Sequence, residues 1–438
     1  MDKIILTPCG RVQGSECNVD GVISFKGIRY ATAERWKYPE IVTQWQGVYD
    51  ATAYGNCSYQ PRAFYNEEEN PGKIFYYNEF RKGETYTYDE DCLFLNIWTP
   101  ENAGSDSGLP VLIYIHGGGF TGGCGHEKHF DGPVWAKKGV VAVTINYRLG
   151  PMGFVCLPEL QEEAGHTGNY GLFDQIAALK WVKKNISAFG GDGDKITVMG
   201  QSAGAMSVQH LCQSELTDGL FRSAVMSSGV GMGSFMTSTP QKTYTFWEEV
   251  MKNTGAKTLG EFRNVSPELL FSEWKKAKGS MMNTSPVKDG ILIKEKAEPK
   301  KIPYMIGSTS HDIAPAFLHP MTRKWGAKKE AYVWHFERML PGDDKGAWHS
   351  SDLWYWFGTL KNCWRPMEEK DYILSNEMSS YLCNFVKYGN PNGESLPLWN
   401  KCKGKKDVMI FGDKETRSGK PPMSKLLKIT LTNKPVGE

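Results

Sequence analysis

The sequence lacks the features that several classes of protein need. None of its apolar runs approaches the length of about 18 residues that a membrane-spanning helix requires. Its charges nearly cancel, with 51 Lys and Arg against 49 Asp and Glu and a formal net charge of +2, whereas nucleic-acid-binding proteins usually carry a basic excess. The ten cysteines include no C-x-x-C pair, the spacing typical of zinc and redox sites. We therefore expect no nucleic-acid partner, no membrane span and no metal site.

The first ten residues also lack the apolar core of a secretory signal peptide. Only Ile4, Ile5 and Leu6 stand together before Pro8, which is too short a run for that purpose. With Met1 at the start, the simplest expectation is a cytoplasmic protein whose cysteines remain thiols in a reducing compartment. We expect a monomer or a weak homo-oligomer.

Glycine and aromatic residues are plentiful. Glycine supplies 47 of the 438 residues, above the usual level of about 7%, which indicates many tight turns or close backbone approaches. Aromatic residues make up 12% of the chain. They fit either a well-packed core or an aromatic-lined substrate cleft.

Short apolar runs alternate with helical patterns along most of the chain. Strands are predicted at residues 111–115, 140–145, 196–199, 224–226 and 304–306, with helices over 173–182 and 203–212. This alternation predicts a single α/β domain over residues 1–438, in which helices cover both faces of a mostly parallel twisted sheet. Residues 230–300 are predicted to be a helical insertion, either a cap or lid or a plain helical excursion. Residues 426–431 could add a last strand.

The strongest local signal is the segment Gly200-Gln201-Ser202-Ala203-Gly204. It follows a predicted strand and opens a predicted helix, as a nucleophile elbow does. A side chain at either glycine would collide with neighbouring backbone, and the sharp turn would push the Ser202 hydroxyl toward a cleft. Ser202 is therefore the candidate nucleophile.

A glycine loop, His116 to Phe120 (HGGGF), follows the strand predicted at 111–115. Such a loop lies opposite the nucleophile elbow in esterases and lipases. The N–H groups of Gly118, Gly119 and Ala203 would then bind the oxyanion of a tetrahedral intermediate. His116 precedes the serine, whereas hydrolases of this kind run serine, acid, histidine, so we expect it to orient the loop rather than to act as the base.

These motifs and others resemble the type-B carboxylesterases, the cholinesterase-like branch of the α/β hydrolases. The similar segments are residues 10–14, 25–31 (FKGIRYA), 90–97 (EDCLFLNI), 146–150 (NYRLG), 168–192 and 389–392 (GNPN). Arg29 stands where proline is usual in the family. The resemblance covers most of the chain and implies an α/β-hydrolase fold with a Ser–acid–His triad.

The resemblance places the acid at Asp312 and the base at His349. Asp312 follows the strand predicted at 304–306, where the family more often has Glu followed by Gly; here Ile313 follows. His349 precedes a segment ending in Phe-Gly, as in the histidine loop of the family. Asp352 is a rival acid, but three residues after His349 we expect it to cap the next helix.

Other histidines that follow the serine include His311, His319 and His335. His335 lies in a strand-like stretch, where a packed or surface position is the default, and we expect His311 to face solvent. None of these replaces His349 as the predicted base.

The residues together predict a serine carboxylester hydrolase that works through an acyl-enzyme and needs neither a metal nor an organic cofactor. Its partner is a small-molecule ester. Two alternatives remain open: a non-catalytic binding or adhesion protein of the same family, and a hydrolase of amide, thioester or lactone bonds.

The resemblance also raises two structural questions. In animal relatives a disulfide ends at the position of Cys92, with Cys57 near the expected partner, whereas a cytoplasmic address favours thiols. The chain is shorter than typical relatives between residues 229 and 307, which suggests an open cleft. Aromatic and methionine side chains that could line it, or pack in the core, are Met232, Phe235, Trp348, Trp354 and Trp356.

Overall fold

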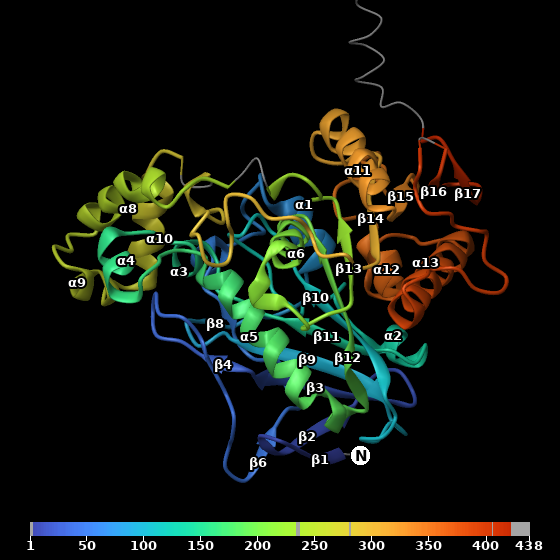
Figure 1. Cartoon of the computed structure of the whole chain (residues 1–438), viewed down its shortest axis with the longest axis horizontal. Coiled ribbons are helices and arrows are strands. Elements are labelled where there is room, and N and C mark those ends of the chain that lie inside the picture. Colours follow the sequence, from blue (N-terminus) through green and yellow to red (C-terminus); the bar gives the residue numbers. More distant parts are fainter. Residues whose placement is uncertain (1–2, 234–236, 280–281, 405, 422–438) are drawn as a thin grey trace, which may run out of the picture.

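The computed structural model describes residues 3–233, 237–279, 282–404 and 406–421, and a long mixed β-sheet forms its centre (Figure 1). The strands follow one another across the sheet in the order β1 (Lys3–Thr7), β2 (Gly10–Glu16), β3 (Val22–Arg29), β9 (Phe94–Pro100), β11 (Val141–Ile145), β10 (Leu109–Ile115), β12 (Gly191–Gln201), β13 (Ser223–Ser227), β14 (Tyr304–Thr309), β15 (Tyr332–Phe336), β16 (Val408–Phe411) and β17 (Thr416–Gly419). A short strand, β6 (Val48–Asp50), pairs with β2. The strand expected at 426–431 and the side chain of Phe235 lie outside the described residues.

The middle of the sheet, from β11 to β16, is parallel, and both ends are antiparallel. Each of the strands predicted between residues 111 and 306 is present, although β11 begins one residue later than expected. The parallel strands are buried on both faces, so their sequences are nearly continuous apolar runs. The edge strands β16 and β17 were not predicted.

Side chains of β10 show why such a run is needed. Val111, Ile113 and Ile115 point into one core with α5 (Tyr170–Asn185) and α6 (Ala203–Gln213). Leu112 and Tyr114 point into the opposite core, which contains α2 (Pro133–Lys137), α12 (Leu353–Phe357) and α13 (Glu369–Tyr388). Because successive strand residues face opposite ways, one five-residue run serves both cores.

The segment predicted as a helical insertion forms α8 (Gln241–Asn253), α9 (Leu259–Arg263) and α10 (Pro267–Lys276). Trp247, Phe262 and Trp274 from these helices pack in a third cluster with Leu160 of α4 (Pro158–Ala164) and Met152 of α3 (Gly150–Gly153). Figure 1 shows this group on one side of the molecule and α11 (Pro315–Lys329), α12 and α13 on the other.

The remaining elements are short. They are α1 (Ile74–Phe80), the strand pair β4 (Ala31–Thr32) and β5 (Glu40–Ile41), and the pair β7 (Cys57–Ser58) and β8 (Tyr88–Asp89). In the described ranges, no helix combines the length and apolar character that crossing a bilayer requires.

Candidate active site

Ser202 lies at the sharp turn between β12 and α6. Its backbone has φ 56° and ψ −124°, a conformation that costs free energy for a residue with a side chain. A Cβ atom at Gly200 would lie 2.3 Å from the backbone of Gly204, and one at Gly204 would lie 2.1 Å from the carbonyl oxygen of Ile115. The two glycines therefore let the turn close and pack against β10, as the sequence analysis expected.

The glycine loop after β10 packs directly on this turn. A Cβ atom at Gly117 would lie 2.6 Å from the carbonyl oxygen of Gln201. Gly118 and Gly119 have φ values of 104° and 64°, which a residue with a side chain rarely adopts. Ser202 and the loop line one cavity, so the loop backbone lies where an oxyanion site needs it. The donor roles of Gly118, Gly119 and Ala203 stay predictions.

His116 lies beneath the loop and is buried. Its Nδ1 is 2.9 Å from the carbonyl oxygen of Gly117, and its ring stacks on Tyr147 with centroids 4.5 Å apart. Burial lowers the pKa of His116 to about 4, so the ring is neutral and Nδ1 can donate to that carbonyl. These contacts agree with a role in orienting the loop.

Asp312 and His349 meet across the end of the sheet. Asp312 follows β14, and its Oδ1 is 2.5 Å from His349 Nδ1. The carboxylate also accepts hydrogen bonds from the Ser228 hydroxyl at 2.6 Å and from the backbone N–H groups of Thr309 and Ile313 at 3.1 and 2.8 Å. Burial alone would raise the pKa of Asp312, but His349 and these donors hold it below its ordinary value. The acid is ionised and keeps the proton of the ring on Nδ1.

The other ring nitrogen of His349 carries the lone pair that a general base needs. The Gln201 side-chain amide nitrogen is 3.1 Å from His349 Nε2, the geometry of an N–H donating to that lone pair. Ser202 and His349 line the same cavity. The Gln201 amide must move away from His349 Nε2 before this nitrogen can accept the Ser202 proton.

The cavity has a volume of about 480 Å³, within the range of small-molecule sites. Much of its wall comes from the segment around α1, including Tyr65, Tyr76 and Phe80. The segment was not predicted to approach the site. The aromatic pattern of α1 (IFYYNEF) was its only signal in the sequence.

Four of the side chains proposed from the sequence as cleft-lining residues lie in the described part of the chain, and they do not line this cavity. Trp348, Trp354 and Trp356 are buried in the core on the α12 side of the sheet, and Met232 packs against the opposite core. The described residues of the 230–300 insertion contribute nothing to the wall. For these residues the core interpretation is correct.

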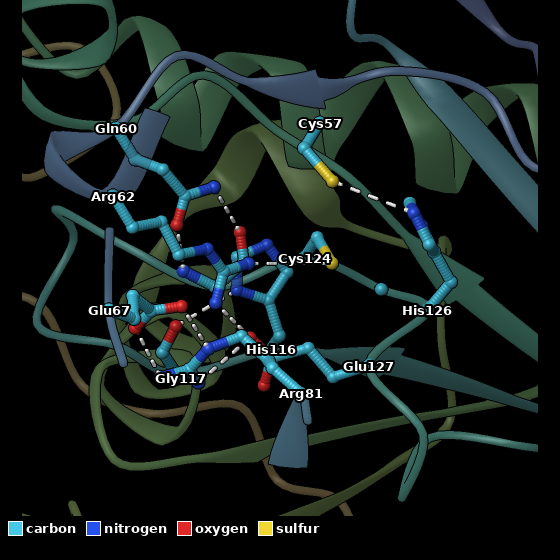
Figure 2. Close-up of polar contacts among 12 residues, drawn as sticks. Cys57, Gln60, Arg62, Glu67, Arg81, His116, Gly117, Cys124, His126 and Glu127 are labelled. Atoms are coloured by element: carbon cyan, nitrogen blue, oxygen red, sulfur yellow. Dashed lines mark hydrogen bonds and ion pairs between the residues drawn. The ribbon is translucent and has the colours of Figure 1, made fainter. Parts of the chain in front are cut away.

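Charged side chains also reach the cavity wall, and they form ion pairs (Figure 2). Glu127 pairs with Arg62 at 2.5 Å and with Arg81 at 3.4 Å, and Arg81 also pairs with Glu67 at 2.7 Å. Although burial opposes it, the two arginines lower the pKa of Glu127 to about 2. This cluster was not predicted, because its members come from separate segments of the chain.

The rival acid Asp352 does not cap α12 through its side chain, contrary to our expectation. It occupies the N-cap position, but Oδ2 accepts hydrogen bonds from the Ser227 hydroxyl at 2.9 Å and from Trp356 Nε1 at 3.1 Å. Burial raises the pKa of Asp352 to about 6. The contact with Ser227 of β13 turns the carboxylate away from the helix N–H groups.

The other histidines considered from the sequence, His311, His319 and His335, do not line the cavity. His311 is exposed, as expected. His335 is buried in β15, and His319 Nε2 is 2.8 Å from the carbonyl oxygen of Thr309. Cys57 and Cys92 are both free thiols.

Comparisons with known proteins agree on the family. The sequence model of the carboxylesterase family matches residues 1–324 and 315–426. Acylcarnitine hydrolase of Mus musculus is 38% identical over 90% of this chain and 84% of its own length. Para-nitrobenzyl esterase of Bacillus subtilis (strain 168) is 39% identical over 61% of this chain, and fumonisin B1 esterase of Sphingopyxis macrogoltabida is 34% identical over 78%. These last two matches span only 51% and 61% of the relatives' own lengths.

Solved structures show the same fold. A PNB esterase structure has a TM-score of 0.79 and 26% identity, with coverage of 95% of this chain and 97% of that one. An esterase of Clostridium hathewayi, described as hydrolysing aliphatic aromatic polyesters, has a TM-score of 0.80 and 26% identity, with coverage of 95% of both chains. The fold is that of an α/β hydrolase, and the chain belongs to the carboxylesterase family.

Proposed function

We propose that the protein is a serine carboxylester hydrolase that cleaves small esters through an acyl-enzyme. The observation that carries the proposal is the pairing of Asp312 with His349 at 2.5 Å, beside a cavity that Ser202 and the glycine loop also line. Membership of the carboxylesterase family supports it.

The proposed mechanism follows from these positions. His349 takes the proton of Ser202 as the serine oxygen attacks the ester carbonyl, and Asp312 stabilises the imidazolium that forms. Gly118, Gly119 and Ala203 N–H groups bind the oxyanion, a contribution worth roughly 100- to 1,000-fold in rate per donor. His349 then protonates the leaving alcohol, and water repeats the cycle to release the acid.

The same residues could attack an amide, a thioester or a lactone. We favour carboxylic esters because the relatives reported above include esterases of this kind. The named substrates of those relatives guide the choice of assay only.

Hydrolysis of p-nitrophenyl esters from acetate to octanoate tests the proposal, with the wild type and Ser202→Ala compared at equal concentration. We expect the wild type to turn over at least the shorter esters. Ser202→Ala should lose roughly 10⁶-fold in kcat, about the loss seen when a triad serine is removed. Ser223→Ala is a matched control, because this serine lies on β13 outside the cavity. Equal activity in Ser202→Ala and the wild type would overturn the proposal.

A further inference from the structure

Two thiols and an imidazole gather beside the glycine loop: Cys57, Cys124 and His126 (Figure 2). The sulfur atoms and one ring nitrogen all lie within 4.8 Å of one another. Cys57 lies on β7, and Cys124 directly follows Gly123 of the loop. The cluster joins two distant segments, so cysteine spacing alone did not reveal it.

One pair of ligand atoms in the cluster has the spacing of a tetrahedral metal site. Cys57 Sγ is 3.5 Å from His126 Nε2. Zinc binds sulfur at about 2.3 Å and imidazole nitrogen at about 2.05 Å, so at a tetrahedral angle the two ligand atoms are about 3.5 Å apart. The separation of Cys57 Sγ and His126 Nε2 is therefore compatible with such an ion.

The imidazole is ready to act as a ligand. Nε2 is the ring nitrogen of His126 that faces Cys57, and a neutral imidazole binds a metal ion through the lone pair of such a nitrogen. The ring of His126 stacks on Tyr54 with centroids 4.6 Å apart and an interplanar angle of 11°. This packing fixes the direction of the ring.

The charged side chains around the cluster already pair with one another. Arg62 Nη2 is 3.7 Å from Cys124 Sγ, but the charge of Arg62 is paired with Glu127, and Arg81 is paired with Glu67. Two thiolates and one divalent cation would add no net charge to this arrangement.

An unpaired oxygen provides independent support for a ligand at this place. The hydroxyl of Tyr86 is buried and has no hydrogen-bond partner among the described residues. The ring of Tyr86 lies beside that of His126, with centroids 5.6 Å apart. Three protein ligands leave one position of a tetrahedral ion free, and buried polar groups without a partner are uncommon in proteins.

We propose that Cys57, Cys124 and His126 bind one Zn²⁺ ion through two thiolates and one imidazole, with release of the two thiol protons to solvent. The ion has a structural role. Gln60 already ties the β7 segment to the loop through Gly123, with hydrogen bonds of 2.8 and 3.0 Å. A metal bridge between Cys57 and Cys124 adds a second tie and holds the glycine loop in place.

Cobalt substitution tests the site without relying on activity. The full chain, kept reduced with a phosphine and freed of metals, is titrated with Co²⁺. We expect one Co²⁺ per chain and a near-ultraviolet thiolate-to-cobalt charge-transfer band, lost in Cys57→Ser and Cys124→Ser and weakened in His126→Gln. Cys212→Ser and Cys383→Ser are matched controls that keep the band, because they remove equally buried thiols on α6 and α13.

Thermal unfolding with one equivalent of Zn²⁺ gives a second readout. Binding to the folded state alone raises Tm, so we expect a rise of several degrees in the wild type and none in Cys124→Ser. If the cysteine variants fail to fold, His126→Gln keeps both thiols and still has to lose affinity. The proposal is overturned by a reduced wild type without the band, by a band that survives in both cysteine variants, or by a Cys57–Cys124 disulfide with no metal uptake.

Discussion

The surroundings of two carboxylates near His349 shift their pKa values in opposite directions. Asp312 accepts from the ring, a hydroxyl and backbone N–H groups, which hold its pKa below the ordinary value. Asp352 has one oxygen without a partner among the described residues, and burial raises its pKa to about 6. Strong stabilisation of the charged form marks Asp312 as the acid of the proposed triad.

The kinetics of Asp312→Asn and Asp352→Asn should separate the two residues. An asparagine at position 312 cannot stabilise the imidazolium and favours the wrong tautomer, so we expect kcat for p-nitrophenyl acetate to fall roughly 10⁴-fold. Asp352→Asn should change kcat less than tenfold. A larger loss in Asp352→Asn than in Asp312→Asn would assign the acid to Asp352.

The raised pKa of Asp352 predicts a pH-dependent stability. Folded Asp352 keeps its proton up to about pH 6, whereas the unfolded residue loses it near 3.8. The unfolded state therefore binds fewer protons between these values, and a rise in pH across this window destabilises the fold by up to about 3 kcal/mol. Asp352→Asn removes this contribution.

Denaturant unfolding of the wild type and Asp352→Asn at pH 4 and pH 7 measures the effect. The free energy of unfolding of the variant, relative to the wild type, should increase by up to about 3 kcal/mol from pH 4 to pH 7. A relative stability that does not change with pH would mean that burial does not raise the pKa of Asp352.

At the scale of elements, the turn from β12 to α6 depends on close backbone contacts. A Cβ atom at Gly204 would overlap the carbonyl oxygens of Ile115 and His116, and backbone cannot move aside as a flexible side chain can. We expect Gly204→Ala to lower the free energy of unfolding by about 3 kcal/mol or more and to abolish esterase activity. Gly104→Ala, at an exposed position with open space around it, is the control and should change neither quantity.

The sequence predicted the elements around this turn well, because buried parallel strands leave continuous apolar runs. Its failures concern contacts between distant segments. Helix capping by Asp352 is a sound expectation from the local sequence. In the structure, however, the hydroxyl of Ser227, which lies on a different element, donates a hydrogen bond to that carboxylate. The position of α1 in the cavity wall depends on packing between distant segments, which a local sequence pattern does not predict. The same holds for Ser228, which donates to Asp312.

At the scale of the whole molecule, the parallel sheet brings the proposed triad together. Ser202 follows β12, Asp312 follows β14, and His349 lies in the connection after β15. The carboxyl ends of parallel strands meet at one edge, where α/β enzymes bind their ligands. The resemblance to the type-B carboxylesterases, together with the order serine, acid, histidine, predicted that Asp312 and His349 meet. The charged cavity wall was not predicted.

The central claim is that Ser202 is an activated nucleophile, and covalent labelling tests it most directly. The native protein is treated with a fluorophosphonate, and the adduct is located by peptide mass spectrometry. We predict one adduct per chain on Ser202, absent in Ser202→Ala and formed much more slowly in His349→Ala. An unlabelled native protein, or an adduct at another serine that persists in Ser202→Ala, would contradict the account.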